Sequence, residues 1–132
     1  INPVRSMIEG KKICIVDDSI VRGTTMITRV KKLRELGAKE VHIRISCPPV
    51  KFPCFYGIDF ASRGELIAAK YSLPEITRML DVDSLHYLSI DGLLRSVMQS
   101  DSYCLACFDG KYPVPCHESG KLRLECGCCG SR

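Results

Sequence analysis

The sequence lacks the features that would assign it to a membrane, secreted or nucleic-acid-binding class. No apolar run approaches the roughly 20 residues that a membrane-spanning helix needs, and no secretory leader opens the chain. The 19 Lys and Arg residues are scattered and leave a net charge of only +4, whereas a nucleic-acid-binding protein usually carries a dense basic patch. We therefore expect no membrane insertion, no nucleic-acid partner and a cytoplasmic location.

The composition also lacks the low hydrophobicity and high net charge of disordered chains. The 132 residues are 45% hydrophobic and 26% charged, close to the average of a folded domain. The chain begins with Ile1 and enters a strand-like run at Lys12, so we interpret it as a fragment that begins inside a domain. We expect residues 1–99 to belong to one α/β domain and residues 100–132 to form a cysteine-rich, irregular tail.

Cysteine, by contrast, is abundant. The odd number of cysteines argues against a closed set of internal disulfides, and in a reducing compartment clustered cysteines more often bind metal. The nine cysteines are Cys14, Cys47, Cys54, Cys104, Cys107, Cys116, Cys126, Cys128 and Cys129.

The first fifty residues have the pattern of a strand, a helix and a second, parallel strand. Residues 12–16 form a short β-branched run typical of a buried parallel strand, in which Cys14 is expected to be a small core residue. Apolar residues then recur at helical spacing from Met26 to Leu36, and Gly37 is placed to end that helix. Residues 41–46 alternate like a second strand. The pattern predicts an α/β fold.

Shorter elements are expected further along the chain. Ser62 can cap a short helix that carries Leu66, Ile67 and Ala69, and Ser72 opens another with Glu75 completing a capping box. Residues 85–88 are expected to form a short strand and residues 91–98 a helix.

The most informative stretch is the loop between the first strand and the first long helix. Two carboxylates end the strand, and a loop with Gly and Thr opens the helix, whose N-terminal amides and dipole favour a bound phosphate. Adjacent carboxylates can accept hydrogen bonds from sugar hydroxyls and attract Mg²⁺. The candidate substrate-binding residues are Asp17, Asp18, Ser19, Ile20, Val21, Arg22, Gly23, Thr24 and Thr25.

A purely structural interpretation of this loop exists. Asp17 and Asp18 could be turn residues, Thr24 or Thr25 could cap the helix, and Arg22 could be solvated instead of contacting phosphate. The apolar strand before the loop and the Gly-Thr-Thr after it favour the binding site.

The loop resembles the phosphoribosyl pyrophosphate (PRPP) loop of type I phosphoribosyltransferases. The sequence of the loop, Asp-Asp-Ser-Ile-Val-Arg-Gly-Thr-Thr, is similar more specifically to that of the glutamine PRPP amidotransferase family. The resemblance implies part of a parallel phosphoribosyltransferase sheet with flanking helices. It implies that Asp17 and Asp18 bind the ribose hydroxyls with Mg²⁺, while Ser19 through Thr25 wrap the 5′-phosphate. Further similar segments lie at residues 2–5, 46–49, 53–59, 65–68, 92–94 and 104–113.

The resemblance also implies an activity, amidophosphoribosyl transfer, in which glutamine-derived ammonia displaces pyrophosphate from PRPP to give 5-phosphoribosylamine in purine biosynthesis. In that family a glutaminase domain with an N-terminal cysteine supplies the ammonia, purine nucleotides such as GMP or AMP inhibit at the PRPP site, and the full-length protein forms homo-oligomers. This chain lacks that domain, so we expect the fragment alone to be inactive, and no catalytic residue is assigned.

Two metal sites are compatible with the cysteines. Cys104 and Cys107 form one C-x-x-C pair, and Cys126 and Cys129 form a second pair with zinc-ribbon spacing. The family resemblance implies instead a [4Fe–4S] cluster on Cys54, Cys104 and Cys107, with a fourth ligand upstream. No family counterpart exists for Cys116, Cys126, Cys128 and Cys129.

Two alternative functions stay open at this point. The chain could be a PRPP- or nucleotide-binding regulatory protein without catalysis, or a zinc-ribbon binding module on an α/β unit.

Overall fold

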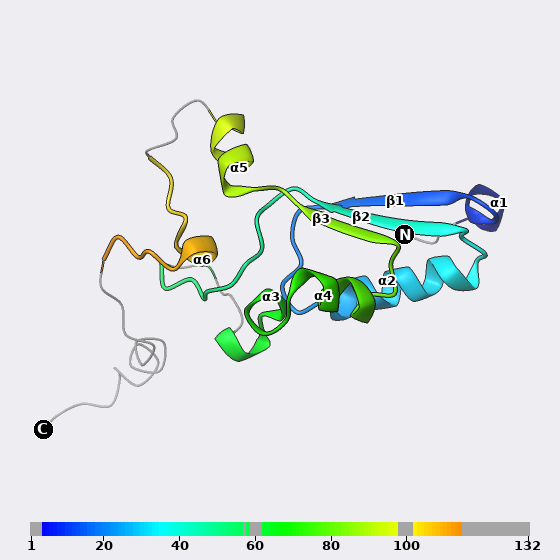
Figure 1. Cartoon of the computed structure of the whole chain (residues 1–132), viewed down its shortest axis with the longest axis horizontal. Helices are drawn as coiled ribbons and strands as arrows, with labels where there is room; N and C mark the ends of the chain where they lie inside the picture. The colour runs from blue at the N-terminus through cyan, green and yellow to red at the C-terminus, as the bar shows by residue number, and fades with distance from the viewer. Residues whose placement is uncertain (1–3, 57, 59–61, 98–101, 115–132) are drawn as a thin grey trace, which may run out of the picture.

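A parallel three-stranded sheet in the order β1–β2–β3 forms the centre of the molecule. The computed structural model describes residues 4–56, 58, 62–97 and 102–114. In Figure 1, α2, α3 and α4 all lie on one side of the sheet. The elements are α1 Arg5–Ile8, β1 Lys12–Asp17, α2 Thr24–Glu35, β2 Glu40–Ile45, the 3₁₀ helix η1 Arg63–Glu65, α3 Ile67–Lys70, α4 Leu73–Met79, β3 Ser84–Tyr87, α5 Ile90–Ser96 and α6 Ala106–Asp109.

The predicted strand–helix–strand unit is present as β1, α2 and β2. The β-branched run of β1 pairs in parallel with β2, from Lys12 opposite Glu40 to Asp17 opposite Ile45. Helix α2 ends where the sequence indicates, because Gly37 follows its C-cap with a φ of +85°, a left-handed conformation that glycine adopts without strain. The predicted α/β fold is confirmed.

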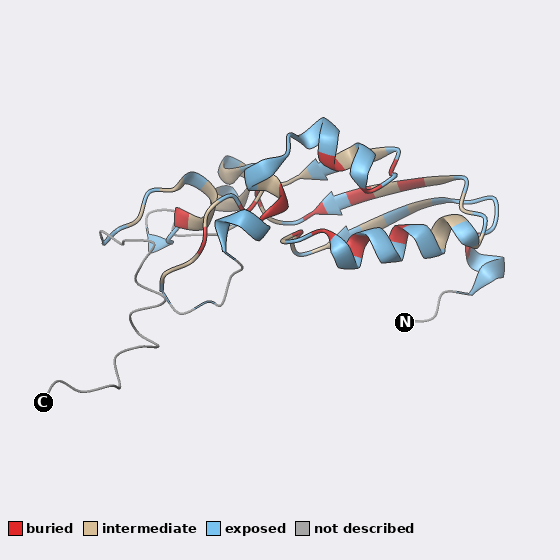
Figure 2. Cartoon of the chain, turned by 90° about the horizontal axis from the view of Figure 1, so that it is seen from below, coloured by how far each residue is buried: buried red, intermediate tan, exposed pale blue. Residues whose placement is uncertain are grey.

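The core lies between the sheet and the helices on that one side. Val41, Ile43 and Ile45 of β2 are buried against Met26 and Val30 of α2. Figure 2 shows buried positions, in red, along both β2 and α2. Each such side chain contributes about 1.5–3 kcal/mol when it is fully buried, so this interface orients α2 and fixes its N-terminus beside the end of β1.

The opposite face of the sheet is exposed at β1. Successive side chains of a strand point to opposite faces, and the burial of β1 alternates accordingly between intermediate and exposed. Cys14 and Val16 lie on this face, and Val16 is 72% exposed. The prediction that Cys14 is a core residue is therefore wrong, because no helix among the described residues covers its side of the sheet.

The second half of the chain follows the predicted elements with shifted boundaries. The single helix expected after Ser62 is divided into η1 and α3, because Leu66 between them is extended, with φ −74° and ψ 113°. Both Ser62 and Ser72 have the predicted capping geometry. Strand β3 and helix α5 each begin one residue earlier than predicted. The predicted boundary between residues 99 and 100 lies outside the described residues.

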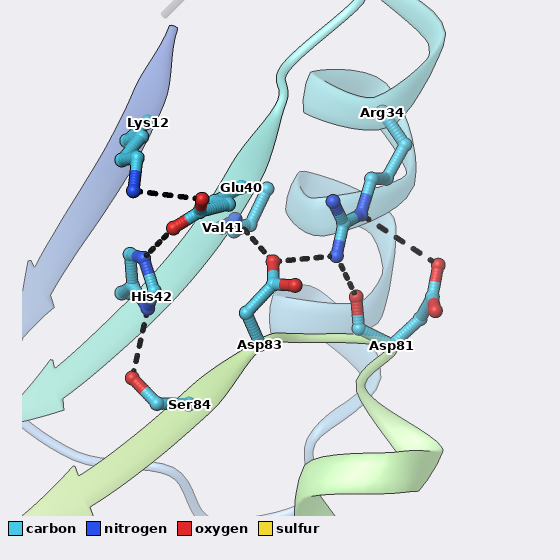
Figure 3. A network of polar contacts seen from close by, with 8 residues as sticks. All are labelled: Lys12, Arg34, Glu40, Val41, His42, Asp81, Asp83 and Ser84. Carbon is cyan, nitrogen blue, oxygen red and sulfur yellow. Dashed lines mark hydrogen bonds and ion pairs between the residues drawn. The ribbon is translucent and has the colours of Figure 1, made fainter.

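A polar network joins the amino ends of the three strands (Figure 3). Lys12 Nζ lies 2.8 Å from Glu40 Oε1, and Glu40 Oε2 lies 3.1 Å from Nε2 of His42. The other ring nitrogen of His42 lies 2.9 Å from Ser84 Oγ. These contacts run across β1, β2 and β3 in turn and hold their register.

A second branch of the network ties α2 to the start of β3. Asp83 Oδ2 accepts hydrogen bonds from the Val41 amide at 2.7 Å and from Arg34 Nη2 at 2.9 Å. The Val41 amide bond, and then the Arg34 guanidinium, hold the pKa of the Asp83 carboxyl below its usual value. Arg34 Nη2 also donates to the carbonyl of Asp81. The carboxylates at this end of the sheet are thus occupied by the fold itself.

Among residues 4–56, 62–97 and 102–114, none forms a helix long and apolar enough to cross a membrane.

Candidate functional site

The predicted loop encloses a hollow at the carboxyl end of β1. The hollow has a volume of about 310 Å³ and opens to solvent. It is lined by all nine predicted residues and by two further residues of α2, namely Asp17, Asp18, Ser19, Ile20, Val21, Arg22, Gly23, Thr24, Thr25, Met26 and Arg29. Ligands of open α/β sheets bind at such carboxyl edges. The structure therefore gathers the predicted binding residues around one cavity.

Asp17 is held in place from two sides. Its Oδ2 lies 2.5 Å from Arg29 Nη1, and its Oδ1 accepts a hydrogen bond from the amide of Asp18 at 3.1 Å. Arg29 was not among the predicted site residues. It lies on the side of α2 that faces β1, and only the packing of the helix on the sheet shows that it meets Asp17. The ion pair fixes the carboxylate and offsets its negative charge.

Asp18 presents a free carboxylate oxygen to the hollow. Its Oδ1 accepts from the Ser19 amide at 2.7 Å, which is the local contact expected of a turn residue. Within the part of the chain that the structure describes, its Oδ2 accepts no hydrogen bond, and the residue is exposed. Asp18 is therefore available to a hydroxyl or to a cation.

The N-terminus of α2 supplies hydrogen-bond donors to the same hollow. Gly23 is the N-cap, with a φ of +83°, and no side chain of the described residues caps this end. The alternative that Thr24 or Thr25 caps the helix is therefore wrong. The first amides of a helix have no partner within the helix. In a 12-residue helix these amides and the helix dipole favour an anion at this position.

A second segment supports the loop from outside. The amide of Ile67 donates to the carbonyl of Val21 at 2.9 Å. A Cβ built on Gly23 would lie 2.8 Å from Cδ1 of Ile67, so a larger residue at this position would require the end of that side chain to move. Arg22 Nε donates to Glu65 Oε1 at 3.0 Å. The start of α3 and the end of η1 thus hold the backbone and one side chain of the loop.

The three predicted cluster ligands lie near one another. Burial raises the pKa of the Cys107 thiol, and the neighbouring Cys54, Cys104 and Asp109 raise it further. Cys54 Sγ accepts a weak hydrogen bond from the Tyr56 amide. However, among the described residues no three His, Cys, Asp or Glu side chains are already arranged to hold a metal ion together.

The segment that carries Cys104 and Cys107 packs on the loop that carries Cys54. The carbonyl of Cys107 accepts from the amides of Lys51 at 2.9 Å and Phe52 at 3.1 Å. The Tyr112 hydroxyl donates to the carbonyl of Pro53 at 2.7 Å. These contacts join residues more than fifty positions apart and place the two cysteine segments side by side.

Cys47 lies between the cysteine segments and the candidate site. It packs with Val21 of the loop and with Cys107 against Val50 and Leu66. Burial raises the pKa of its thiol to about 11, and the charges of Asp18 and Cys107 contribute to that shift. A thiol with so high a pKa is protonated and poorly nucleophilic at neutral pH, so Cys47 serves in packing. The remaining cysteines named for the zinc ribbon, Cys126 and Cys129, and also Cys116 and Cys128, lie outside the described residues.

The fold and the loop together define a class of protein. A parallel sheet whose strand ends in paired aspartates, followed by a glycine-containing loop and a helix N-terminus, is the arrangement of a phosphoribosyltransferase-type α/β unit.

Comparison with known proteins shows which members of this class the chain is similar to. The chain is 51% identical over 129 residues to an amidophosphoribosyltransferase of Synechococcus elongatus, covering 95% of the chain and 26% of the relative. It is 49% identical over 127 residues to that of Bacillus subtilis, covering 92% of the chain and 27% of the relative. It is 50% identical over 115 residues to that of Methanothermobacter thermautotrophicus, covering 86% of the chain and 24% of the relative. No family model matches the chain.

Solved structures agree with these relatives. A structure of the allosteric regulatory enzyme of purine biosynthesis superimposes with a TM-score of 0.80 at 48% identity, covering 89% of this chain and 26% of that chain. Glutamine PRPP amidotransferase from B. subtilis, complexed with ADP and GMP, superimposes with a TM-score of 0.80 at 50% identity, covering 87% of this chain and 26% of that chain.

The chain is homologous to a segment of the amidophosphoribosyltransferases. It spans about a quarter of the length of the curated relatives that it matches. The family resemblance predicted from the sequence is confirmed.

Proposed function

We propose that this chain is the PRPP-binding part of an amidophosphoribosyltransferase. The observation that carries the proposal is the hollow at the end of β1, where all predicted loop residues meet below the N-terminus of α2. Its donors are suited to phosphate and its acceptors to ribose hydroxyls, and PRPP contains both groups.

Asp17 and Asp18 have different roles at the ribose. Asp18, with one free carboxylate oxygen, accepts from a ribose hydroxyl or contacts Mg²⁺. Asp17, held by Arg29, presents a fixed second carboxylate. Mg²⁺ is usually bound through one or two carboxylates together with substrate phosphates. A pair of aspartates next to a pyrophosphate therefore fits this donor set, and a bound Mg²⁺ would offset charge on the leaving pyrophosphate.

The loop backbone holds the 5′-phosphate. The amides from Ser19 to Thr25 and the first turn of α2 provide donors, and the exposed hydroxyls of Thr24 and Thr25 add two more. Arg22 lies at the rim of the same hollow and supplies a positive charge.

The proposed reaction is the displacement of pyrophosphate from the anomeric carbon of PRPP by glutamine-derived ammonia. The C1–O bond to pyrophosphate breaks and a C1–N bond forms, which gives 5-phosphoribosylamine, and the ammonium proton is lost to solvent. Such a reaction passes through positive charge on the sugar ring. The residues of this chain contribute mainly by fixing the sugar and the phosphate.

Calorimetric titration of PRPP into the chain in the presence of Mg²⁺ tests the proposal. Asp18→Asn is expected to weaken binding roughly tenfold or more, since a hydrogen bond to a charged group contributes about 1.5–3 kcal/mol. Asp91→Asn is the matched control, because Asp91 is an exposed aspartate of α5 that is paired only with Arg95 among the described residues. Equal affinity of the wild type and Asp18→Asn would overturn the assignment.

We also propose that purine nucleotides compete for this hollow. The B. subtilis neighbour was solved with ADP and GMP, and a nucleoside 5′-phosphate carries the same ribose and 5′-phosphate groups as PRPP. GMP is expected to reduce the apparent affinity for PRPP, and this effect should be lost in Asp18→Asn. GMP binding that leaves the PRPP affinity unchanged would contradict competition.

Finally, we propose that Cys54, Cys104 and Cys107 are ligands of a [4Fe–4S] cluster. Three thiols on two segments that pack side by side, two of them half-buried, fit the thiolate donor set of such a cluster. The cluster would supply a crosslink between the segments. A brown anaerobic protein with about four irons per chain, lost in Cys107→Ser but not in Cys14→Ser, would support this proposal. A colourless protein with about one zinc would support the zinc ribbon instead.

A further inference from the structure

Glu65 has its two carboxylate oxygens engaged in different tasks. Oε2 accepts from the Ser62 amide at 3.1 Å and from the Ser62 hydroxyl at 3.0 Å, which closes the capping box of η1. Oε1 lies 3.0 Å from Nε of Arg22, a residue 43 positions earlier in the phosphate-binding loop. The Ser62 bonds, and then Arg22, hold the pKa of the Glu65 carboxyl below its usual value. Glu65 is thus an ionised link between η1 and the loop.

Glu65 contacts only Nε of Arg22 among the described residues, which leaves the two terminal guanidinium nitrogens available. Glu65 contacts Nε, and within residues 4–56, 58, 62–97 and 102–114 the terminal guanidinium nitrogens have no hydrogen-bond partner. Arg22 lines both the loop hollow and a neighbouring hollow that Glu65 also lines. The guanidinium therefore stands at the boundary of the two, fastened through Nε, and its Nη pair can still form a bidentate contact with a phosphate.

From this arrangement we infer that Glu65 is a positioning residue, which holds Arg22 so that its terminal nitrogens meet a phosphate or pyrophosphate group of the ligand. An arginine side chain has several rotatable bonds, and fixing it before binding reduces the entropy lost on binding. This inference rests on the proposed PRPP site and adds to it a residue outside the loop motif.

The chain contains a matched control for this role. Glu75 closes a capping box of the same pattern at the start of α4, with Oε2 accepting from the Ser72 amide at 2.7 Å and from its hydroxyl at 2.6 Å. Glu75 makes no ion pair with the loop among the described residues. Gln can replace Glu in a capping box because its amide oxygen also accepts. Glu65→Gln and Glu75→Gln therefore both preserve a cap, and only the first removes the acceptor of Arg22.

The experiment measures PRPP affinity with Mg²⁺ for the wild type, Glu65→Gln, Glu75→Gln, Arg22→Ala and the double variant Arg22→Ala/Glu65→Gln. Glu65→Gln is expected to weaken binding roughly fivefold, the upper range for the coupling of an exposed ion pair, whereas Glu75→Gln leaves the affinity unchanged. In the Arg22→Ala background, Glu65→Gln is expected to have no further effect. The Nε–H signal of Arg22 in nitrogen–proton spectra reports the contact directly and should shift only in Glu65→Gln.

The outcomes separate the inference from the proposal on which it rests. Wild-type binding that Glu65→Gln does not weaken, or an equal loss in the Arg22→Ala background, would overturn the positioning role while leaving the PRPP site in place. A purely structural role of the Glu65–Arg22 contact would lower the melting temperature of Glu65→Gln relative to Glu75→Gln and leave the affinity for PRPP unchanged. Absence of PRPP binding by the wild type would overturn both statements.

Discussion

The two ends of the sheet use carboxylates in opposite ways. At the amino ends of the strands, Glu40 and Asp83 are engaged by neighbouring strands and by α2, with contacts from 2.7 to 3.1 Å (Figure 3). At the carboxyl end of β1, Asp18 keeps an oxygen without a partner among the described residues, and the N-terminus of α2 has no side-chain cap. The fold itself pairs the carboxylates at the amino ends, whereas the carboxyl end keeps groups that have no partner among the described residues.

This difference separates the residues that are expected to determine stability from those that are expected to determine ligand affinity. A buried polar group must be paired within the protein or it costs folding free energy. Groups that are left unpaired at an exposed hollow cost little before the ligand arrives and gain a partner when it binds. Substitutions at the amino ends should therefore change stability, and substitutions at the carboxyl end should change affinity.

The largest effect on stability is expected from Asp83→Ala. This change leaves the amide of Val41 without its acceptor, and Val41 is fully buried, so we expect a loss of about 2 kcal/mol in the free energy of unfolding. Urea denaturation measures this loss, and PRPP affinity should be unchanged. Asp91→Ala, at an exposed aspartate of α5, is the control and should cost less than about 0.5 kcal/mol. A variant Asp83→Ala that is as stable as the control would contradict the comparison.

An intermediate effect is expected from two glycines with the same backbone conformation. Gly23 and Gly37 have φ values of +83° and +85°, so replacement by Ala should cost each about 1–2 kcal/mol of backbone strain. Gly23→Ala also places Cβ 2.8 Å from the end of the Ile67 side chain and acts within the proposed binding loop, so it alone should weaken PRPP binding. Gly37→Ala, at the amino end, should bind PRPP normally. Equal affinities of the two variants would show that the loop does not require this close approach.

The smallest effect on stability is expected from lowering the pH. The carboxyl pKa values of Glu40 and Asp83 are lowered, by Lys12 and then His42 in the first case and by the Val41 amide and then Arg34 in the second. A lowered pKa contributes stability above the unfolded value, which is about 4, and that contribution is lost as the pH falls through the folded value. Urea midpoints should therefore be similar at about pH 7 and about pH 5 and should fall below about pH 4.

Salt provides the control for this titration. These carboxylates are largely exposed, so the acid sensitivity should be modest and should decrease further at high ionic strength. A midpoint that falls already between about pH 7 and about pH 5 would show that groups other than these two carboxylates are responsible, because carboxyls with lowered pKa values stay ionised over that range.

The sequence predicted the local elements well because their signals are local. The strand at Lys12, the helix end at Gly37 and the capping box at Ser72 each depend on residues within a few positions of one another. The predictions that were wrong concern features that depend on packing between residues far apart in the sequence. Cys14 sits in an apolar run, yet its face of the sheet is uncovered, and Leu66 is drawn into the core in an extended conformation that interrupts a helix.

The sequence by itself determined the strand, loop and helix order of this protein and the residues that line the hollow at the end of β1. These features follow from periodicity, from glycine placement and from a motif of adjacent residues. Only the tertiary structure decided that Arg29 holds Asp17, that Glu65 holds Arg22 and that Cys107 packs against the loop of Cys54. Such contacts join residues that are far apart in the chain, and they exist only once the helices are packed on the sheet.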